Sequence, residues 1–196
     1  MAQTKLVLTG GPHSGKTTLF NQLKEAFPEA HFVPEPAESV ILRELDKQAI
    51  DPDYTPILPT TDYPSFLPIV VDESLRLEAL AAGSELVICD RSLVDNLAFI
   101  AINAAGDLAT RHVSRLAAAA RYSFALFLEQ LPTYANTPVR RESREFAARI
   151  ALATHSVYAN CFAGNMADLP AVGLEARAEL ARQKIEGFLA ATQKAS

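Results

Sequence analysis

Residues 10–18 of the chain read Gly10-Gly11-Pro12-His13-Ser14-Gly15-Lys16-Thr17-Thr18. The first eight of them fit the pattern G-x-x-x-x-G-K-[S/T], which here follows a short apolar run at residues 6–8. A helical pattern of apolar residues over residues 16–27 comes directly afterwards. A strand, a glycine-containing turn and a helix in this order gather backbone N–H groups and the positive end of a helix dipole around one point. The stretch therefore predicts a loop that wraps around a phosphate chain.

This phosphate loop (residues 10–18) assigns a part to each of its polar residues. The Lys16 ammonium is expected to reach the β and γ phosphates of a nucleotide, and the Thr17 hydroxyl is expected to bind Mg²⁺. His13 is interpreted as a variable position at the mouth of the site, without a chemical role. The loop residues expected to surround the nucleotide are Gly10, Gly11, Pro12, His13, Ser14, Gly15, Lys16, Thr17 and Thr18.

The rest of the chain alternates apolar runs with helical patterns. Near-continuous apolar runs are typical of strands that are buried on both faces of a parallel sheet. A single domain over residues 1–196 is therefore expected, with a three-layer α/β fold in which a mostly parallel five-stranded sheet has helices on both faces. The strands are expected at residues 6–8, 31–33, 86–89, 124–128 and, less clearly, between 161 and 169; the helices are expected at residues 16–27, 39–48, 69–82, 95–104, 111–121 and 174–189, with a further long helix after residue 140.

Two segments interrupt this alternation. Residues 51–68 contain five prolines among aromatic and acidic residues, which predicts an ordered but irregular loop that contacts substrate. Residues 132–145 resemble a lid, because Arg140, Arg141 and Arg144 could close over a triphosphate and stabilise the charge of the transferred group. The alternative is that Glu142 and Glu145 pair with these arginines on a solvated helix face.

Asp90 stands at the carboxyl end of the third apolar run, at the edge of the sheet where ligands gather in open α/β folds. A carboxylate there can hold Mg²⁺ directly or through water; the alternative is that Asp90 caps a turn or pairs with Arg91. Motor and transport ATPases generally have an acidic residue directly after this aspartate, whereas this chain has Arg91. The chain also lacks an N-K-x-D or T-K-x-D segment that would read guanine. Both absences favour a small-molecule kinase.

Glu35 follows the second expected strand and precedes Pro36. A carboxylate at that strand end could accept the proton of an acceptor hydroxyl as the hydroxyl attacks a γ phosphate. The alternative is an exposed loop glutamate held by a rigid proline. The spacing alone does not decide between the two.

Composition narrows the class of partner and the setting. The chain has 18 basic and 23 acidic side chains, a formal charge of −5, which argues against a general nucleic-acid binder. Its two cysteines, Cys89 and Cys161, show no metal-site spacing, so a reducing, cytoplasmic setting is expected. No apolar stretch reaches the roughly 20 residues that a membrane-spanning helix needs, and no transmembrane segment is expected.

Four segments in this order resemble the P-loop ATPase domain related to ribosylnicotinamide kinase, an AAA-type ATPase domain. They are the phosphate loop with Thr9, the Glu35-Pro36-Ala37 stretch, residues 87–92 with Asp95, and Arg140-Arg141-Glu142. The resemblance spans most of the chain and implies a P-loop NTPase fold that binds ATP. Eukaryotic relatives in that family, the TRPL translocation defect proteins, look like GTP- and phospholipid-binding trafficking factors, which implies a different use of the same site.

Glu35-Pro36 and Asp90-Arg91-Ser92 are also similar to segments of deoxynucleoside kinases. That resemblance implies that Glu35 is the base and that Arg91 contacts phosphate or the acceptor. This chain departs from the pattern in having Asp90 where those kinases have Glu, and in having no Trp, which is frequent beside their acceptor. The departures leave the acceptor open.

Two functions follow from these observations. The first is phosphotransfer, in which ATP or GTP with Mg²⁺ donates its γ phosphate to a nucleoside-like or other small hydroxyl acceptor near Glu35 and residues 51–68. Lys16, Asp90, Arg91 and the three arginines of residues 140–144 would assist as catalytic residues. The second is an ATP- or GTP-binding switch with slow hydrolysis that regulates a protein or lipid partner. An oligomer is compatible with both.

Overall fold

The computed structural model describes residues 3–132 and 143–195. At its centre is a sheet in the order β2-β3-β1-β4-β5, in which every neighbouring pair of strands is parallel. Val7 of the central strand is in register with Cys89 on one side and with Ala125 on the other. The strands are β1 (Thr4–Thr9), β2 (His31–Val33), β3 (Leu86–Asp90), β4 (Phe124–Leu128) and β5 (Met166–Leu169).

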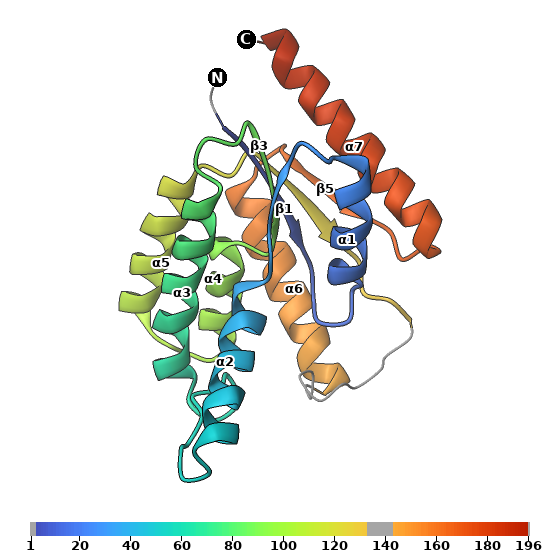
Figure 1. Ribbon diagram of the computed structural model, residues 1–196. Coiled ribbons are helices and arrows are strands. Elements are labelled where there is room, and N and C mark those ends of the chain that lie inside the picture. The colour runs from blue at the N-terminus through green and yellow to red at the C-terminus, as the bar shows by residue number, and fades with distance from the viewer. Residues whose placement is uncertain (1–2, 133–142, 196) are drawn as a thin grey trace.

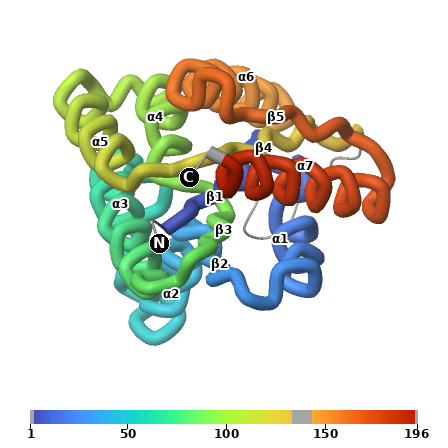
Figure 2. Tube along the Cα trace, turned by 90° about the horizontal axis from the view of Figure 1, so that it is seen from above, coloured from blue at the N-terminus to red at the C-terminus, as the bar shows by residue number. Residues whose placement is uncertain are grey.

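Helices cover both faces of this sheet, as Figures 1 and 2 show. Successive side chains of a strand point to opposite faces. Leu6 and Leu8 of β1 therefore join a core with α1 and α7, whereas Val7 between them joins a second core on the other face. The helices are α1 (Lys16–Ala26), α2 (Pro36–Ile50), α3 (Tyr63–Leu80), α4 (Leu93–Ile102), α5 (Asp107–Ala120), α6 (Arg144–Cys161) and α7 (Leu174–Ala195).

The predicted three-layer α/β fold is confirmed, and so is the fifth strand. All residues of β3 and β4 are buried, which explains their apolar sequences. The parallel arrangement brings the carboxyl ends of β1, β2 and β3 to one edge of the sheet. The phosphate loop, Glu35 and Asp90 lie at those three ends.

The prediction of an irregular loop over all of residues 51–68 is wrong for its last part, because α3 begins at Tyr63. Asp62 caps the helix by accepting a hydrogen bond from the Ser65 N–H (3.2 Å). Pro64 lies in the first turn, where its missing N–H is not needed. Pro68 lies inside the helix, which continues past it because neighbouring residues such as Phe66 are buried in the core. The positions of the prolines therefore did not indicate where the loop ends and α3 begins.

The irregular part that remains, residues 51–62, is fastened to α2 by one buried carboxylate. Glu44 accepts hydrogen bonds from the Tyr54 hydroxyl (2.6 Å) and the Ile57 N–H (3.1 Å), and pairs with Lys47. These contacts agree with the expectation of an ordered segment. None of the helices in the described ranges is sufficiently long and apolar to cross a membrane.

Candidate functional site

The phosphate loop is a tight turn that packs against β4 and α6. A Cβ atom on Gly10, whose φ is 143°, would lie 2.5 Å from the carbonyl oxygen of Leu128. A Cβ atom on Gly11 would lie 2.7 Å from the Cβ atom of Ala151 in α6. Neither space admits a side chain, so both glycines are required by close approach of neighbouring backbone and side chains. His13 adopts a left-handed conformation (φ 60°), which lets the loop turn before Gly15, the N-cap residue of α1.

Lys16 folds back over this loop. Its buried Nζ donates hydrogen bonds to the carbonyl oxygens of Gly10 (3.1 Å) and Gly11 (2.9 Å) and to Ser14 Oγ (3.2 Å). Burial and the nearby positive charge of Arg91 lower the pKa of Lys16 to about 8. A phosphate anion that entered the loop would therefore stabilise the charged form of Lys16.

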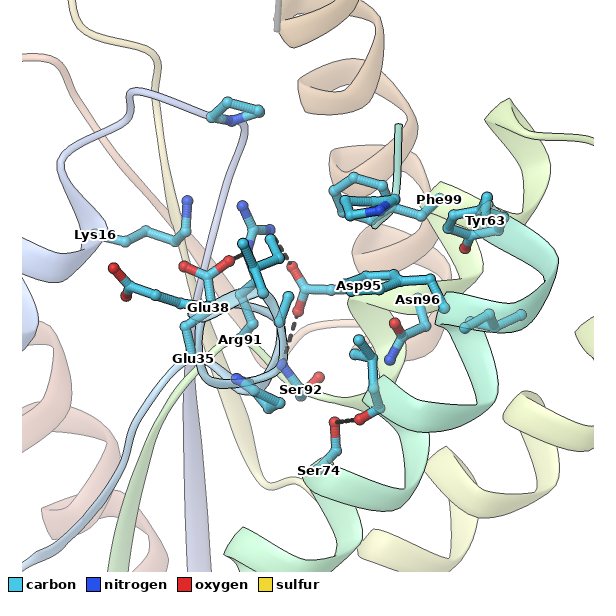
Figure 3. A pocket seen from close by; sticks show the side chains of 18 of the residues that line it. Lys16, Glu35, Glu38, Tyr63, Ser74, Arg91, Ser92, Asp95, Asn96 and Phe99 are labelled. Carbon is cyan, nitrogen blue, oxygen red and sulfur yellow. Dashed lines mark hydrogen bonds and ion pairs between the residues drawn. The ribbon is translucent and has the colours of Figure 1, made fainter. Parts of the chain in front are cut away.

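Arg91 joins two carboxylates beside the loop. Its Nε donates to Glu35 Oε1 and its Nη1 to Asp95 Oδ1, both at 2.9 Å, and Nη1 also reaches the carbonyl oxygen of Gly10 (3.2 Å). Burial opposes the charged form, but Glu35 and Asp95 together hold the pKa of Arg91 above its ordinary value. Figure 3 shows the three side chains meeting, with Lys16 next to them.

The backbone of Arg91 is left-handed, with φ at 69°. Within the described chain, His13 and Arg91 are two of the four non-glycine residues with positive φ, and both lie in this site. The Arg91 N–H donates to the carbonyl oxygen of Leu8 (2.9 Å), which fixes the turn after β3. Strain of this kind persists where surrounding contacts hold it, and it is common at functional sites.

Asp95 organises the second side of the cluster. One of its oxygens accepts from the Thr9 hydroxyl (2.8 Å) and the other from the Ser92 N–H (2.9 Å). The Tyr158 hydroxyl of α6 donates to that second oxygen. The sequence analysis named Thr9 and Asp95 only as part of the family resemblance, without a role, and it did not single out Tyr158. The Ser92-x-x-Asp95 spacing was an available signal, since it forms a capping box at the start of α4.

Asp90 is almost fully buried at the end of β3, and within residues 3–132 and 143–195 its Oδ1 has no hydrogen-bond partner. Burial and the negative charge of Glu35 raise the pKa of Asp90 to about 6. No cluster of three or more His, Cys, Asp or Glu side chains that could hold a metal occurs in the described residues. A single carboxylate such as that of Asp90 fits Mg²⁺, because Mg²⁺ usually takes one or two carboxylates and completes its shell with water and substrate phosphates. Thr17, in the first turn of α1, fits the same arrangement.

A cavity of about 150 Å³ opens from this charged cluster into the space between α2, α3 and α4. One end is lined by the phosphate loop, Glu35 and Arg91, and the other by apolar side chains of α3 and Phe99 of α4 (Figure 3). Pro59 and Thr60 also line it, so part of the predicted substrate segment reaches the cavity. That these residues contact a substrate stays a prediction.

Arg177 of α7 supports the phosphate loop from the other face, and sequence reasoning missed it. Its guanidinium donates to the carbonyl oxygens of Ser14 (2.6 Å), Glu129 (2.6 Å) and Leu169 (3.1 Å). Arg177 is 3% exposed, and burial lowers its pKa. With Gly15 and Thr18 it also lines a hollow of about 90 Å³. No motif marks this arginine, because its partners are backbone carbonyls from distant segments.

The structure thus brings four of the predicted catalytic residues together: Lys16, Glu35, Asp90 and Arg91. Arg144 begins α6 and is exposed, and it does not line the cavity. Arg140 and Arg141 lie outside the described residues. Of the phosphate loop, residues 12–16 line the cavity, whereas Thr18 lies at the smaller hollow.

A phosphate loop between β1 and α1 in a parallel sheet, with an aspartate at the end of the adjacent strand, defines the class of protein: this is a P-loop NTPase. The model of an AAA domain family, AAA_28, matches residues 5–177. Because that match covers most of the chain, the protein belongs to this family, and the predicted AAA-type resemblance is confirmed.

Solved structures show the same architecture. Thymidylate kinase from Ehrlichia chaffeensis aligns with a TM-score of 0.67 over 94% of this chain and 100% of that chain, at 12% sequence identity. At 12% sequence identity, this similarity shows a shared fold. The comparison with curated proteins finds no match to the sequence.

Proposed function

We propose that the protein transfers the γ phosphate of ATP, with GTP as the alternative donor, to a hydroxyl group of a small nucleoside-like molecule in the cavity. The observation that carries this proposal is that the cavity runs from the phosphate loop past Glu35 to an end lined mainly by apolar side chains of α3 and α4. A site that only hydrolysed nucleotide would need room for water beside the phosphates. A cavity with an apolar wall favours a second substrate.

Glu35 is the base in this scheme. The acceptor oxygen forms a bond to the γ phosphorus while the bond between that phosphorus and the bridging oxygen breaks. ADP leaves with the electron pair, and the hydroxyl proton passes to the Glu35 carboxylate. The Arg91 guanidinium fixes the orientation of Glu35 through the 2.9 Å hydrogen bond from Nε. Positioning by such contacts supplies much of the catalysis in phosphoryl transfer.

Lys16 and the backbone N–H groups of the phosphate loop bind the β and γ phosphates. The carbonyl oxygens of Gly10 and Gly11 would release the Lys16 ammonium to the nucleotide. Thr17 and Asp90 are the residues that would hold Mg²⁺, which in such sites neutralises charge on the transferred group. The Oδ1 atom of Asp90 is buried and has no hydrogen-bond partner in the part of the chain that the structure describes, which supports this assignment.

The test is release of ADP from Mg·ATP, and of GDP from Mg·GTP, with and without a panel of hydroxyl acceptors. Lys16→Ala is the active-site variant, and Lys24→Ala is the matched control because Lys24 is exposed on the same helix. We expect acceptor-dependent release by the wild type and by Lys24→Ala, and at least about a 100-fold loss with Lys16→Ala, since charge stabilisation of the transferred group is lost. Release without any acceptor, or binding without turnover, would contradict phosphotransfer and favour a nucleotide-dependent switch.

A further inference from the structure

The geometry points to an acceptor that carries no phosphate of its own, and to Asn96 and Tyr63 as the residues that recognise the polar edge of its ring. The inference rests on the proposed phosphotransfer and narrows its second substrate to an uncharged hydroxyl compound with one flat ring. Three features of the cavity support it, and they concern its charge, its size and the polar groups at its far end.

Charge is the first feature. The charged side chains that line the cavity in the described part of the chain are Lys16 and Arg91 against Glu35, Glu38 and Asp95, with His13 at the mouth. Lys16 belongs to the nucleotide end, and Arg91 is already paired with two carboxylates. A phosphate monoester brings between one and two negative charges. Placed here it would meet Glu35 and Asp95, and among the described lining residues no cation beyond Lys16 and the paired Arg91 would balance it, whereas a neutral hydroxyl compound needs none.

Size and lining are the second feature. The whole cavity, its charged end included, has a volume of about 150 Å³. A wholly apolar cavity of about that volume holds one benzene ring, so the far end has room for no more than one small ring. The far end of this cavity is formed by Phe66, Leu67 and Val70 of α3 and by Phe99 of α4. Phe99 also lies against the Arg91 guanidinium, 5.7 Å from the ring centroid, which fixes its position. These walls suit an aromatic or heteroaromatic ring.

The polar groups at that end are the third feature. The Tyr63 hydroxyl is buried and has no hydrogen-bond partner among the described residues. Asn96 is 9% exposed, and it lines the cavity with its amide side chain. Figure 3 shows both side chains on the same side of the cavity, away from Lys16. Buried polar groups without partners are costly unless a ligand or water satisfies them. An amide beside a hydroxyl offers both donors and acceptors to a ring edge.

The first experiment compares matched pairs of acceptors, each a nucleoside and its own 5′-monophosphate, in the ADP-release assay. A second readout is equilibrium binding of the same pairs in the presence of Mg²⁺ and a non-hydrolysable ATP analogue. We expect nucleosides to react and bind at least about tenfold better than their monophosphates. Preference for the monophosphates in either readout would overturn the inference while leaving phosphotransfer in place. If no member of any pair binds, the inference also fails.

Variants test the two recognition residues separately from the reaction. For Asn96→Leu and Tyr63→Phe we expect KM for the acceptor to rise at least about tenfold, with KM for ATP unchanged within about twofold, because only the contact to the ring edge is lost. Asn160→Leu, on the exposed part of α6, is the control and is expected to behave as wild type. Asn96→Asp keeps the acceptor oxygen and replaces the NH₂ donor with a second acceptor oxygen, so it should change which ring is preferred. Equal loss for every ring and for ATP would indicate a structural role and overturn the assignment.

Discussion

Arg91 Nε donates a hydrogen bond to Glu35 Oε1 (2.9 Å), so the residue directly after β3 is hydrogen-bonded to the residue at the N-cap position of α2. The contact links two strand ends that are 56 positions apart in the sequence. It sets the carboxylate at the point where the cavity meets the phosphate loop. The position of Glu35 therefore depends on a partner as well as on its own backbone.

Replacing Glu35 separates binding from chemistry. We expect Glu35→Gln to lower kcat at least about 100-fold while the affinity for ATP changes less than about threefold, because the amide keeps the size of the side chain but cannot take the acceptor proton. The measurement is steady-state kinetics beside nucleotide titration. Glu25→Gln, on the exposed side of α1, is the control. An unchanged kcat would remove Glu35 as the base.

Asp90 gives the site a pH-dependent effect on stability. Burial and Glu35 raise its pKa from 3.8 to about 6, so ionised Asp90 opposes folding at pH values above 6. That opposition fades as the pH falls from 6 towards 4, where the group is protonated in the folded protein. At about 1.4 kcal/mol per pKa unit, we expect Asp90→Asn to raise the free energy of unfolding by about 1–3 kcal/mol at pH 7.5.

The measurement is urea unfolding without nucleotide at pH 7.5 and at pH 4.5. The gain from Asp90→Asn should shrink at the lower pH, because the wild-type carboxyl is then neutral as well. Asp46→Asn, at an exposed position of α2, serves as the comparison. A gain of equal size at both pH values would show that ionisation of Asp90 is not its cause.

The hydrogen bonds of Arg177 lead us to expect that α7 affects nucleotide binding through the phosphate loop. Arg177→Met removes the donors to Ser14, Glu129 and Leu169 and leaves three carbonyl groups short of partners. We expect a loss of about 2–4 kcal/mol in the free energy of unfolding and weaker ATP binding, because the back of the phosphate loop is no longer held. Arg177→Lys should recover part of both. Denaturation and nucleotide titration of both variants check this, and ATP affinity equal to wild type in Arg177→Met would contradict it.

Whether a feature could be predicted from the sequence depends on whether neighbouring residues alone determine it. The phosphate loop and the buried strands were predictable because each is encoded in consecutive residues, and Asp90 because it ends such a strand. Tyr158 and Arg177 were not, since their roles come from contacts between segments far apart in the chain, and Arg177 binds only carbonyl oxygens. For Asp95 the local spacing marks only the start of α4, and its contacts with Thr9 and Tyr158 come from distant segments. Residues 63–68 were misassigned because Pro64 is tolerated in the first helical turn, which the Asp62 cap sets, and because buried packing carries the helix past Pro68.

Gly11 and Ala151 provide a test of the packing between the phosphate loop and α6. A Cβ atom at Gly11 would lie 2.7 Å from the Ala151 Cβ atom and 3.2 Å from the carbonyl oxygen of Ala147. Gly11→Ala should therefore push the loop away from α6 and lower ATP affinity at least about tenfold, because a loop displaced by a fraction of an ångström no longer presents its N–H groups to phosphate.

Ala151→Gly removes the nearer of these two obstacles. Alone it should cost about 1 kcal/mol of stability, the usual price of glycine inside a helix, and leave ATP affinity unchanged. In the double variant we expect partial recovery of ATP affinity, because the close approach to the backbone of α6 remains. Affinities from nucleotide titration of all four proteins give the coupling between the two positions. If the effects of the two substitutions simply add, the contact with Ala151 is not what excludes a side chain at Gly11.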